Sequence, residues 1–306
     1  MKKQLSNGIF DIIIIGGGPA GLTSALYCAR AQKKTLVLDK GDSYLEKASK
    51  IENYFGIDSI SGKELLEKGR KQALRFGALM KKEEVLSISL AGEDFEVKTN
   101  QNAHTCKFII LATGASQNSQ KIENLEGFVG KGVSYCVTCD GFFFKDKKVA
   151  VIGSRNFAAH EALELLNYTK NVTIITNKEK VEIDPSILEN LKKEKVEIVD
   201  KKIKKIIGKE SAEEIELENN EKMKFDGIFV AVGSGNAASF AKTLGIELIK
   251  EKFIKVDSSG KTNFPKIYAG GDCIGGKQVA TAVGEGARAA ISILSEISQK
   301  EHIDYH

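Results

Sequence analysis

The sequence predicts an α/β protein with two Rossmann-like, three-layer dinucleotide-binding domains, the second inserted into the first. A strand, a glycine-rich loop, a helix and a second strand follow one another in residues 11–39, and this pattern returns 137 positions later. A further apolar strand near the C-terminus ends in another glycine turn, so we expect the first domain to resume there. The predicted boundaries are 1–116 plus 247–306 for the outer domain and 117–246 for the inserted domain.

The composition excludes several classes of protein. Hydrophobic residues make up 42% of the 306 positions and charged residues 28%, which is ordinary for a soluble globular chain. No apolar run is long enough to span a membrane, and Asp11 interrupts the N-terminal apolar stretch, which predicts a buried strand and not a signal peptide. A formal net charge of +4, without aromatic residues among the basic ones, argues against nucleic-acid binding.

The first glycine loop has the form that binds a pyrophosphate. Gly16 makes the tight turn, Gly18 lets the backbone approach the phosphates, and Gly21 lets the helix pack closely on the strand. The free N–H groups at the start of the helix would face the anion. Asp39 ends the second strand, where a carboxylate accepts the hydroxyls of an adenosine ribose. The complete strand–loop–helix–strand–acid context makes this a strong signal.

The second unit keeps the strand and helix of the first but loses its loop chemistry. Arg155 replaces the middle glycine and would occupy the space of a pyrophosphate, whereas Ala158 is an accepted substitute for the third. Thr176 and Asn177 stand where an acidic residue for NAD or an arginine cluster for NADP would be expected. We interpret the unit as a degenerate nucleotide fold. The alternative is that other cations bind a phosphate, namely Arg155 itself, Lys178 or Lys180.

Two further strand ends complete the expected cofactor site of the outer domain. One apolar strand runs into the turn at Thr113–Gly114, and another places Asp272 at its end. A helix rich in small residues follows from about Gln278 to Leu294, which permits close packing and lets its N-terminus approach a ligand. A bound cofactor would therefore reach from the first glycine loop to Asp272.

The stretch "GVSYCVTCDGFFFKDK" carries a C-x-x-C pair, Cys136 and Cys139, next to Asp140. Two thiols at this spacing can close a small disulfide ring, one acting as nucleophile and the other resolving it, and Asp140 could protonate a leaving thiolate. The alternatives are a metal site, disfavoured because zinc needs four ligands and no second pair exists, and a merely structural pair.

The other three cysteines have a simpler interpretation. We expect Cys28 and Cys106 to be small buried hydrophobic residues, and Cys273, beside Asp272, to be a packed free thiol with an open question of function.

Over nearly its full length the chain resembles the low-molecular-weight thioredoxin reductases. The matching stretches are "GGGPAG", "ALYCARA", "IENYFGI…SGKEL", "ATGAS", "GVSYCVTCDGFF", "VAVIG" and "YAGGD…KQVATAVGEG". The resemblance implies FAD on the outer domain, a redox disulfide on the inserted domain, thioredoxin as substrate and a homodimer. It implies that Cys139 faces the flavin, Cys136 attacks the substrate disulfide and Asp140 is the acid–base group.

The same resemblance names the FAD contacts, with Lys277 standing where the family usually has arginine. They are Gly16, Gly18, Pro19, Ala20, Gly21, Asp39, Lys40, Leu45, Asn53, Val85, Ala112, Thr113, Gly114, Gly271, Asp272, Lys277, Gln278 and Val279.

Three departures from the family pattern bear on the electron donor and on FAD. The inserted domain has "GSR" in place of "GGG", and "TNKEKVE" in place of the "HRR…R" run for the NADPH 2′-phosphate. The loop after Asp39 reads "GDSYLEKAS" in place of "GGQL". The first two departures make NADPH doubtful and favour the ferredoxin-dependent, pyridine-nucleotide-independent branch. Ferredoxins are typically acidic, and the outer domain carries the net positive charge.

The sequence therefore predicts a cytoplasmic flavoenzyme that reduces thioredoxin through Cys136–Cys139 with electrons from ferredoxin. Three alternatives remain open: an NADPH-dependent thioredoxin reductase with altered cofactor contacts, a dithiol oxidase that uses oxygen, and a non-catalytic flavin-binding regulatory protein. The C-terminal Tyr305 and His306 are expected to be a frayed end, although an aromatic residue there covers the flavin in some relatives.

Overall fold

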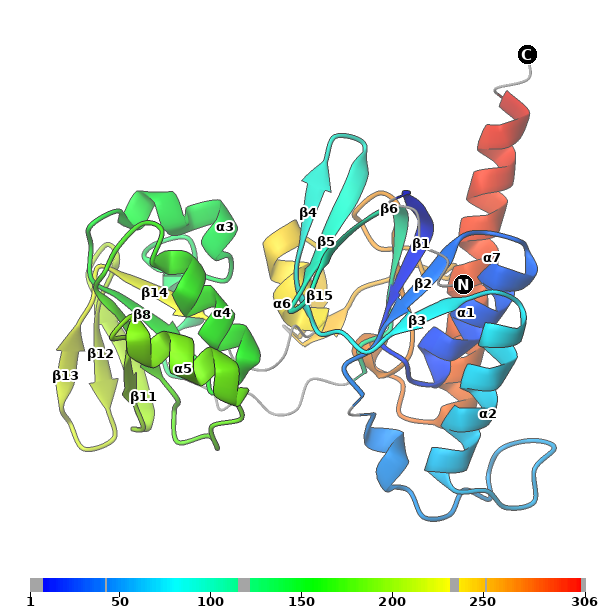
Figure 1. The fold of residues 1–306 in the computed structure, drawn as a ribbon, viewed down its shortest axis with the longest axis horizontal. Coiled ribbons are helices and arrows are strands. Elements are labelled where there is room, and N and C mark those ends of the chain that lie inside the picture. Colours follow the sequence, from blue (N-terminus) through cyan, green and yellow to red (C-terminus); the bar gives the residue numbers. More distant parts are fainter. Residues whose placement is uncertain (1–7, 42, 115–121, 232–236, 251, 304–306) are drawn as a thin grey trace. The chain divides into compact units, whose positions relative to one another are not determined.

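The computed structural model describes residues 8–41, 43–114, 122–231, 237–250 and 252–303. The chain divides into two compact units, Met1–Ser116 with Asn236–His306, here the outer unit, and Gln117–Gly235, here the inserted unit (Figure 1). Tyr305 and His306 lie outside the described residues. No helix in the described part of the chain is both long enough and apolar enough to cross a membrane.

The outer unit begins its second segment earlier than the sequence suggested. Residues 236–246 were assigned to the inserted domain, but they belong to the outer unit. This stretch contains helix α6 (Ala237–Leu244), whose Phe240 and Ala241 are buried in the same core cluster as Val85. The predicted boundary at 246 is therefore wrong, because the apolar side of this helix packs on the outer core.

A seven-stranded sheet forms the centre of the outer unit, in the order β3-β2-β1-β6-β5-β4 with β17 paired to β6. The pairs among β1, β2, β3, β6 and β17 are parallel, and those that join β4 and β5 are antiparallel. The strands are β1 (Phe10–Ile15), β2 (Thr35–Leu38), β3 (Leu79–Lys81), β4 (Val85–Ala91), β5 (Asp94–Thr99), β6 (Ala103–Leu111) and β17 (Ile267–Ala269).

Helices cover both faces of this sheet (Figure 1). On one face Ile12 and Ile14 pack with the small residues of helices α1 and α7, and on the other Ile13 and Ile15 pack with α6. This alternation is the period-two pattern of a strand that is buried on both sides. The remaining elements are α1 (Pro19–Arg30), η1 (Tyr44–Lys47), α2 (Gly62–Arg75), β15 (Leu248–Ile249), β16 (Phe253–Ile254), η4 (Asp272–Ile274) and α7 (Val279–Ile303).

The inserted unit is built on a five-stranded parallel sheet, in the order β10-β9-β8-β14-β7, with a separate antiparallel sheet β11-β12-β13. Its strands are β7 (Val133–Ser134), β8 (Val149–Ile152), β9 (Val172–Ile175), β10 (Glu197–Val199), β11 (Ile203–Gly208), β12 (Ala212–Leu217), β13 (Lys222–Lys224) and β14 (Gly227–Val230). Its helices are η2 (Glu126–Phe128), α3 (Val137–Asp140), η3 (Gly141–Phe144), α4 (Asn156–Leu165) and α5 (Pro185–Lys193).

The two units repeat the same strand pairing. Ile15 pairs with Leu38 between β1 and β2, and Ile152 pairs with Ile175 between β8 and β9. Both residues of the pair have moved by the 137 positions found in the sequence. The predicted repeat and the fold class are confirmed.

Candidate functional site

The two cysteines of the C-x-x-C pair form a disulfide at the start of a one-turn helix. Cys136 is the N-cap of α3, and its Cα lies 5.3 Å from that of Cys139. The backbone N–H of Cys139 donates to Cys136 Sγ at 3.1 Å. Cys139 is exposed and Cys136 half-buried, so the disulfide lies at the surface of the inserted unit, open to exchange with an outside thiol.

Asp140 closes the same turn and is held by a residue that the sequence analysis did not single out. The hydroxyl of Ser134 donates to Asp140 Oδ2 at 2.6 Å. The hydroxyl oxygen of Ser134 also accepts the backbone N–H of Cys136 at 3.0 Å. Ser134 ends strand β7 and is buried. A serine near a cysteine pair is common in sequence, and only the fold shows which acid it reaches.

A buried carboxylate also supports the turn. Glu161, on helix α4, accepts the backbone N–H of Val137 at 3.2 Å. This N–H lies in the first turn of α3, where no intrahelical acceptor is available. Glu161 falls on an amphipathic helix pattern, where nothing in the sequence distinguishes it from a solvated charge.

Two aromatic side chains that follow the disulfide closely in the chain are exposed. Phe142 and Phe143, in η3, are 69% and 67% exposed. Neighbouring Phe144 is instead packed edge-on against Phe229, with ring centroids 5.3 Å apart. The "FFF" run therefore divides into one core residue and two that offer apolar surface next to the reactive sulfurs.

The first glycine loop has the shape expected of a phosphate cradle. Gly16 has φ of +110°, and a Cβ there would overlap the carbonyl oxygen of Ala112. A Cβ on Gly21 would overlap the carbonyl of Gly16, so helix and strand are in close contact. At Gly18, the N-cap of α1, no atom lies within 4 Å of the Cβ position. The loop thus leaves open space in front of the helix N-terminus, where an anion is stabilised.

Asp39, which follows β2, lies against this loop. Its carboxylate is the nearest group to a Cβ built on Gly17, and Arg70 Nη2 lies 3.5 Å from its Oδ2. The backbone N–H of Asp39 donates to the carbonyl of Lys81 at 3.1 Å, which brings the β3–β4 corner beside it. Val85 opens β4 just after this corner and its side chain is buried in the core, so only its backbone could meet a ligand.

The far end of the expected site is formed by the ends of β6 and β17. Thr113 Oγ1 is buried without a hydrogen-bond partner in the described structure, an orphaned polar atom of the kind that a ligand can satisfy. Gly271 has φ of +86° and its backbone N–H donates to Glu285 Oε2 at 2.8 Å. Burial raises the pKa of the Asp272 carboxyl, and nearby Lys277 opposes that shift. Burial likewise raises the pKa of Glu285.

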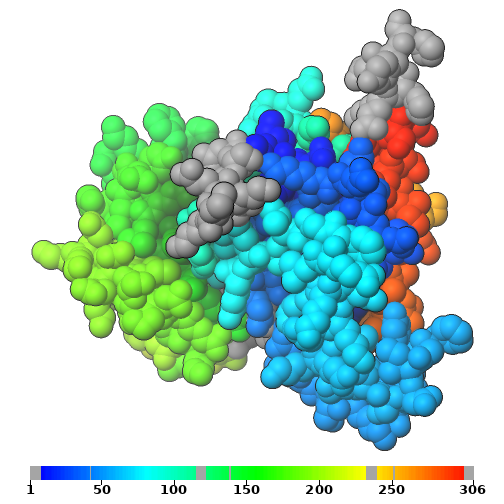
Figure 2. All heavy atoms as spheres, turned by 45° about the vertical axis from the view of Figure 1, so that its right-hand side comes forward, coloured from blue at the N-terminus to red at the C-terminus, as the bar shows by residue number. Residues whose placement is uncertain are grey.

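A separate segment reaches this end of the site. The Nδ2 group of Asn53 donates to Gln278 Oε1 at 3.0 Å, which joins the 43–60 stretch to the start of α7. In Figure 2 this stretch forms the lower part of the visible face of the outer unit, below α2. Its η1 holds Leu45, whose carbonyl packs against Gly62. Phe55 in the same stretch is fully exposed.

Thus most of the expected FAD residues lie in the outer unit just after the carboxyl ends of β1, β2, β6 and β17, whereas Leu45, Asn53 and Val85 lie on other segments. Ligands of doubly wound sheets bind at this edge. Pro19 and Ala20 begin α1, Lys40 follows Asp39, Gly114 follows Thr113, and Val279 begins α7. Contact with FAD itself stays a prediction.

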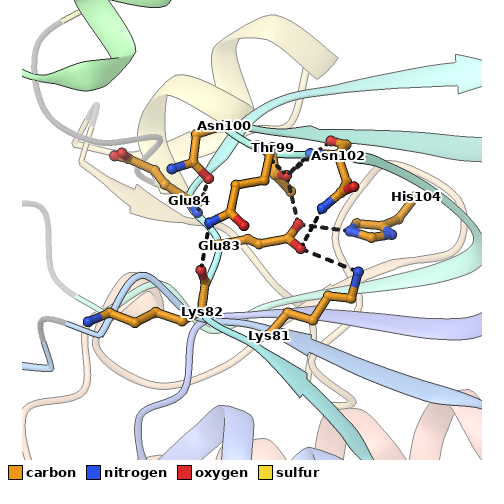
Figure 3. A network of polar contacts seen from close by, with 9 residues as sticks. Lys81, Lys82, Glu83, Glu84, Thr99, Asn100, Asn102 and His104 are labelled. Atoms are coloured by element: carbon orange, nitrogen blue, oxygen red, sulfur yellow. Dashed lines mark hydrogen bonds and ion pairs between the residues drawn. The ribbon is translucent and has the colours of Figure 1, made fainter. Parts of the chain in front are cut away.

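A buried polar network surrounds Glu83, in the connection between β3 and β4 (Figure 3). Glu83 is only 4% exposed, and its carboxylate accepts from Thr99 Oγ1 at 2.7 Å and Asn102 Nδ2 at 2.8 Å. His104 Nε2 lies 2.9 Å from the same group, and Lys81 Nζ 3.3 Å. Burial raises the pKa of Glu83, but the hydrogen bonds from His104, Thr99 and Asn102 together outweigh it and hold the pKa below its usual value.

In the inserted unit, an acidic segment lies across the second loop. The backbone N–H of Glu182 donates to the carbonyl of Ser154 at 2.8 Å. The carboxylate of Glu182 pairs with Arg155 Nε at 3.3 Å, and Ser154 Oγ donates to Glu179 at 3.2 Å. Asn156 exchanges two hydrogen bonds with Asp184, of 2.9 and 2.8 Å. The backbone and side chains of the segment 179–184 are therefore bonded across the second glycine loop. The corresponding position of the first glycine loop, at Gly18, is open.

The ribose end of the second unit is also occupied. Thr176 donates to Asp200 Oδ1 at 2.6 Å, and Lys178 lies 3.4 Å from Asp200 Oδ2. Asn177 is buried and accepts the backbone N–H of Ile203 at 2.7 Å. Of the cations proposed to reach a phosphate, Arg155 and Lys178 are thus paired with carboxylates.

The three remaining cysteines are packed free thiols. Burial raises the pKa of Cys28, Cys106 and Cys273 to about 12 in each case. Cys273 is 2% exposed, and its thiol donates to the carbonyls of Leu111 and Gly270. Burial in the core and a raised pKa both disfavour the thiolate form of Cys273. No group of histidine, cysteine or acidic side chains in the described residues could hold a metal ion.

Known proteins are similar to this chain in sequence and in fold. Residues 10–286 match the pyridine nucleotide-disulphide oxidoreductase family. The chain is 35% identical to the thioredoxin reductase of Aquifex aeolicus over 98% of its own length and 97% of the relative's. It is 34% identical to that of Mycolicibacterium smegmatis, over 94% and 96%.

Solved structures of two kinds resemble it. The atypical thioredoxin reductase TRi from Desulfovibrio vulgaris Hildenborough is 40% identical, with a TM-score of 0.84 over 95% of this chain and 98% of that one. A ferredoxin-flavin thioredoxin reductase from Clostridium acetobutylicum is 30% identical, with a TM-score of 0.75 over 95% and 98%. The chain therefore belongs to the pyridine nucleotide-disulphide oxidoreductase family and, within it, to the low-molecular-weight thioredoxin reductases.

Proposed function

We propose that this protein is an FAD-dependent reductase of the thioredoxin disulfide, working through Cys136–Cys139, and that its electrons come from reduced ferredoxin and not from NADPH. The single observation that carries the choice of donor is the segment 179–184, which is bonded across the second glycine loop.

The outer unit fits FAD. Gly18 leaves room for a pyrophosphate, Asp39 stands where a ribose would lie, and Thr113 Oγ1 lacks a partner in the described structure. When bound, FAD supplies the electron pair that opens the disulfide. Asp272 and Gln278 would hold its far end, at the start of α7.

The cysteines then pass the pair on by thiol–disulfide exchange. The Cys136 thiolate attacks one sulfur of the thioredoxin disulfide, which forms a mixed disulfide and releases one thioredoxin thiolate. The Cys139 thiolate attacks the Cys136 sulfur, which restores the Cys136–Cys139 disulfide and releases the second thiolate. Asp140 lies in the same turn and would protonate a leaving thiolate. One dithiol is oxidised and one disulfide is reduced.

The exposed phenylalanines support a protein substrate. Phe142 and Phe143 offer apolar surface beside sulfurs that must meet a partner disulfide. A small-molecule dithiol or disulfide is too small to cover both rings, whereas aromatic residues are enriched at protein interfaces.

The second glycine loop argues against NADPH. A pyrophosphate there would have to displace Glu182, break its pair with Arg155, and approach three carboxylates, Glu179, Glu182 and Asp184. The 2′-phosphate would meet Asp200 where it needs cations. The carboxylates at the pyrophosphate position and Asp200 at the 2′-phosphate position would both repel NADPH, which carries several negative charges.

Ferredoxin is supported by relatives and by charge. Two solved structures described as ferredoxin-flavin thioredoxin reductases from Clostridium acetobutylicum are 30% and 31% identical, with TM-scores of 0.75 and 0.66. The outer unit carries the positive balance of a chain with formal net charge +4, which suits an acidic partner.

We also propose a homodimer in the cytoplasm. Apolar side chains are exposed on the helices of the outer unit, at Tyr27 on α1, Leu74 on α2 and Ile291 on α7. Free thiols outside the redox pair suit a reducing compartment. Light scattering at several protein concentrations tests the dimer.

Anaerobic reduction of the purified flavoprotein by NADPH, NADH and reduced ferredoxin in parallel tests the proposal. Reduced ferredoxin should bleach the flavin and, with thioredoxin present, generate thioredoxin thiols, while both pyridine nucleotides leave the flavin oxidised. Rapid bleaching by micromolar NADPH would overturn the choice of donor. Oxygen consumption with a dithiol and no thioredoxin reduction would indicate an oxidase. Unchanged behaviour of Cys136→Ser and Cys139→Ser would indicate a non-catalytic flavoprotein.

A further inference from the structure

We propose that Ser134 is a positioning residue for Asp140 and that its hydroxyl serves both protonation states of that acid. The inference rests on the proposed thiol–disulfide chemistry of Cys136 and Cys139. It goes beyond it by assigning a role to a side chain outside the C-x-x-C-D motif.

The turn needs support that survives reduction. Helix α3 has only four residues, so it cannot be stable alone, and the disulfide that closes it is lost when the dithiol forms. Two side chains from outside the turn accept its first N–H groups through oxygen atoms that are not part of the disulfide. Ser134 accepts from Cys136, and Glu161 accepts from Val137.

Ser134 is itself held firmly. It lies in β7, where it pairs with Phe229 of β14, and its side chain is buried. Its oxygen therefore stays in place when the disulfide opens. Because Asp140 Oδ2 lies 2.6 Å from this oxygen, the orientation of the carboxyl group is set by the strand and not by the mobile sulfurs.

The hydroxyl has the right capacity for two states. A serine oxygen carries one hydrogen and two lone pairs. One lone pair accepts the Cys136 N–H. When Asp140 is ionised, the hydrogen is donated to Oδ2 at 2.6 Å. When Asp140 is protonated, the second lone pair can accept its proton, and the serine hydrogen can turn to the carbonyl of Cys136, 3.3 Å away.

Besides the two cysteines, the titratable groups that the described contacts bring to this turn are Glu161 from α4, Tyr168, whose ring packs against Gly141, and Tyr135, whose hydroxyl donates to Glu126 at 3.0 Å. Glu161 is engaged with the Val137 N–H. The structure thus assigns the hydroxyl of Ser134 to Asp140 in both steps, when the acid gives up its proton and when it regains it.

Ser134→Ala tests the assignment, with Ser134→Thr as the matched variant that keeps a hydroxyl and suits a strand. The prereduced enzyme is mixed anaerobically with oxidised thioredoxin, and with a small aromatic disulfide, across a range of pH. We expect Ser134→Ala to slow transfer to both disulfides about tenfold or more, as loss of a hydrogen bond to a charged group does. The pH profile should shift, and Ser134→Thr should recover most of the rate.

The same substitutions in an Asp140→Asn background decide between coupling and scaffolding. If Ser134 acts through Asp140, adding Ser134→Ala to Asp140→Asn changes the rate little. An equal loss in both backgrounds, or an unshifted pH profile in Ser134→Ala, would overturn the proposal. If wild-type enzyme reduces the small disulfide but not thioredoxin, the proposed substrate fails while Ser134 is still tested.

Discussion

Gly18→Ala should weaken FAD binding while leaving the apoprotein as stable as the wild type. The backbone at Gly18 has φ of −77° and ψ of −174°, an extended conformation that alanine adopts freely. Apart from Gly18 and its two neighbours in the chain, no residue comes within 4 Å of the new methyl group. Alanine stabilises by about 0.4–1 kcal/mol through the unfolded chain. It is a poorer N-cap than glycine by about 1 kcal/mol, so the two terms nearly cancel.

The loss in affinity follows from where the methyl group lies. It occupies the open space at the N-terminus of α1, into which a pyrophosphate would come. Displacing the phosphate from one backbone N–H forfeits a charge-assisted hydrogen bond worth about 1.5–3 kcal/mol. That corresponds to a rise in the dissociation constant of about 10- to 150-fold.

Gly16→Ala is the matched control and should fail differently. Gly16 has φ of +110°, and its new Cβ would overlap the carbonyl oxygen of Ala112. Backbone strain of this kind costs about 1–3 kcal/mol before the overlap is counted. Gly16→Ala should therefore lower the free energy of unfolding of the apoprotein itself.

The assay separates the two effects. Apoprotein of each variant is titrated with FAD by flavin fluorescence, and its unfolding is followed in urea. Wild-type affinity for FAD in Gly18→Ala would refute the reasoning. So would a weakened affinity that merely follows a loss of apoprotein stability as large as that of Gly16→Ala.

Three further predictions concern the donor, the substrate and pH. Arg155→Gly should not confer NADPH reduction of the flavin, because Glu179 to Asp184 and Asp200 remain in place; substantial activity in that single variant would show that the loop was the only barrier. The double substitution Phe142→Ser and Phe143→Ser should raise the KM for thioredoxin about tenfold or more and leave the KM for a small disulfide unchanged. Steady-state kinetics with both substrates measures the difference. Glu83→Gln should lower the free energy of unfolding by about 1–3 kcal/mol at neutral pH. Because the folded pKa of Glu83 lies below its unfolded value, the wild-type advantage is complete above that unfolded value and is lost as pH falls through the folded pKa, so the urea curves of the two proteins should converge in acid.

The sequence was sufficient for the parts of the fold that have a local period. The isoleucine run of β1, the glycine loop and the small residues of α1 are recorded in adjacent positions, so they could be read without contacts. The strand, loop, helix and strand of the second unit could be predicted because they repeat those of the first unit 137 positions later. Burial of Cys28 and Cys106 followed from their apolar surroundings in the same way.

The parts that could not be predicted depend on residues distant in the chain. The boundary at 246 failed because α6 is amphipathic whichever core it packs on, and only tertiary contact shows that Phe240 belongs to the outer unit. Helix α4 and strand β9 separate Arg155 from Glu182 in the chain, and the Lys- and Glu-rich sequence around Glu182 indicates a solvated face. The sequence indicated a missing cation cluster but not the acidic segment that takes its place.

The two glycine loops explain how one unit can lose its ligand and keep its fold. In the outer unit the space in front of α1 is open, and Thr113 Oγ1 has no hydrogen-bond partner in the described structure. In the inserted unit Arg155, Ser154 and Asn156 are paired with carboxylates of the chain itself, so these loop residues have partners without a nucleotide. Strand β14 and helix α4 of that unit nevertheless support the turn that carries the disulfide. Strand β14 pairs with β7 and so holds Ser134, and α4 supplies Glu161, so both supports of the redox turn require the nucleotide-type fold whether or not its loop binds anything.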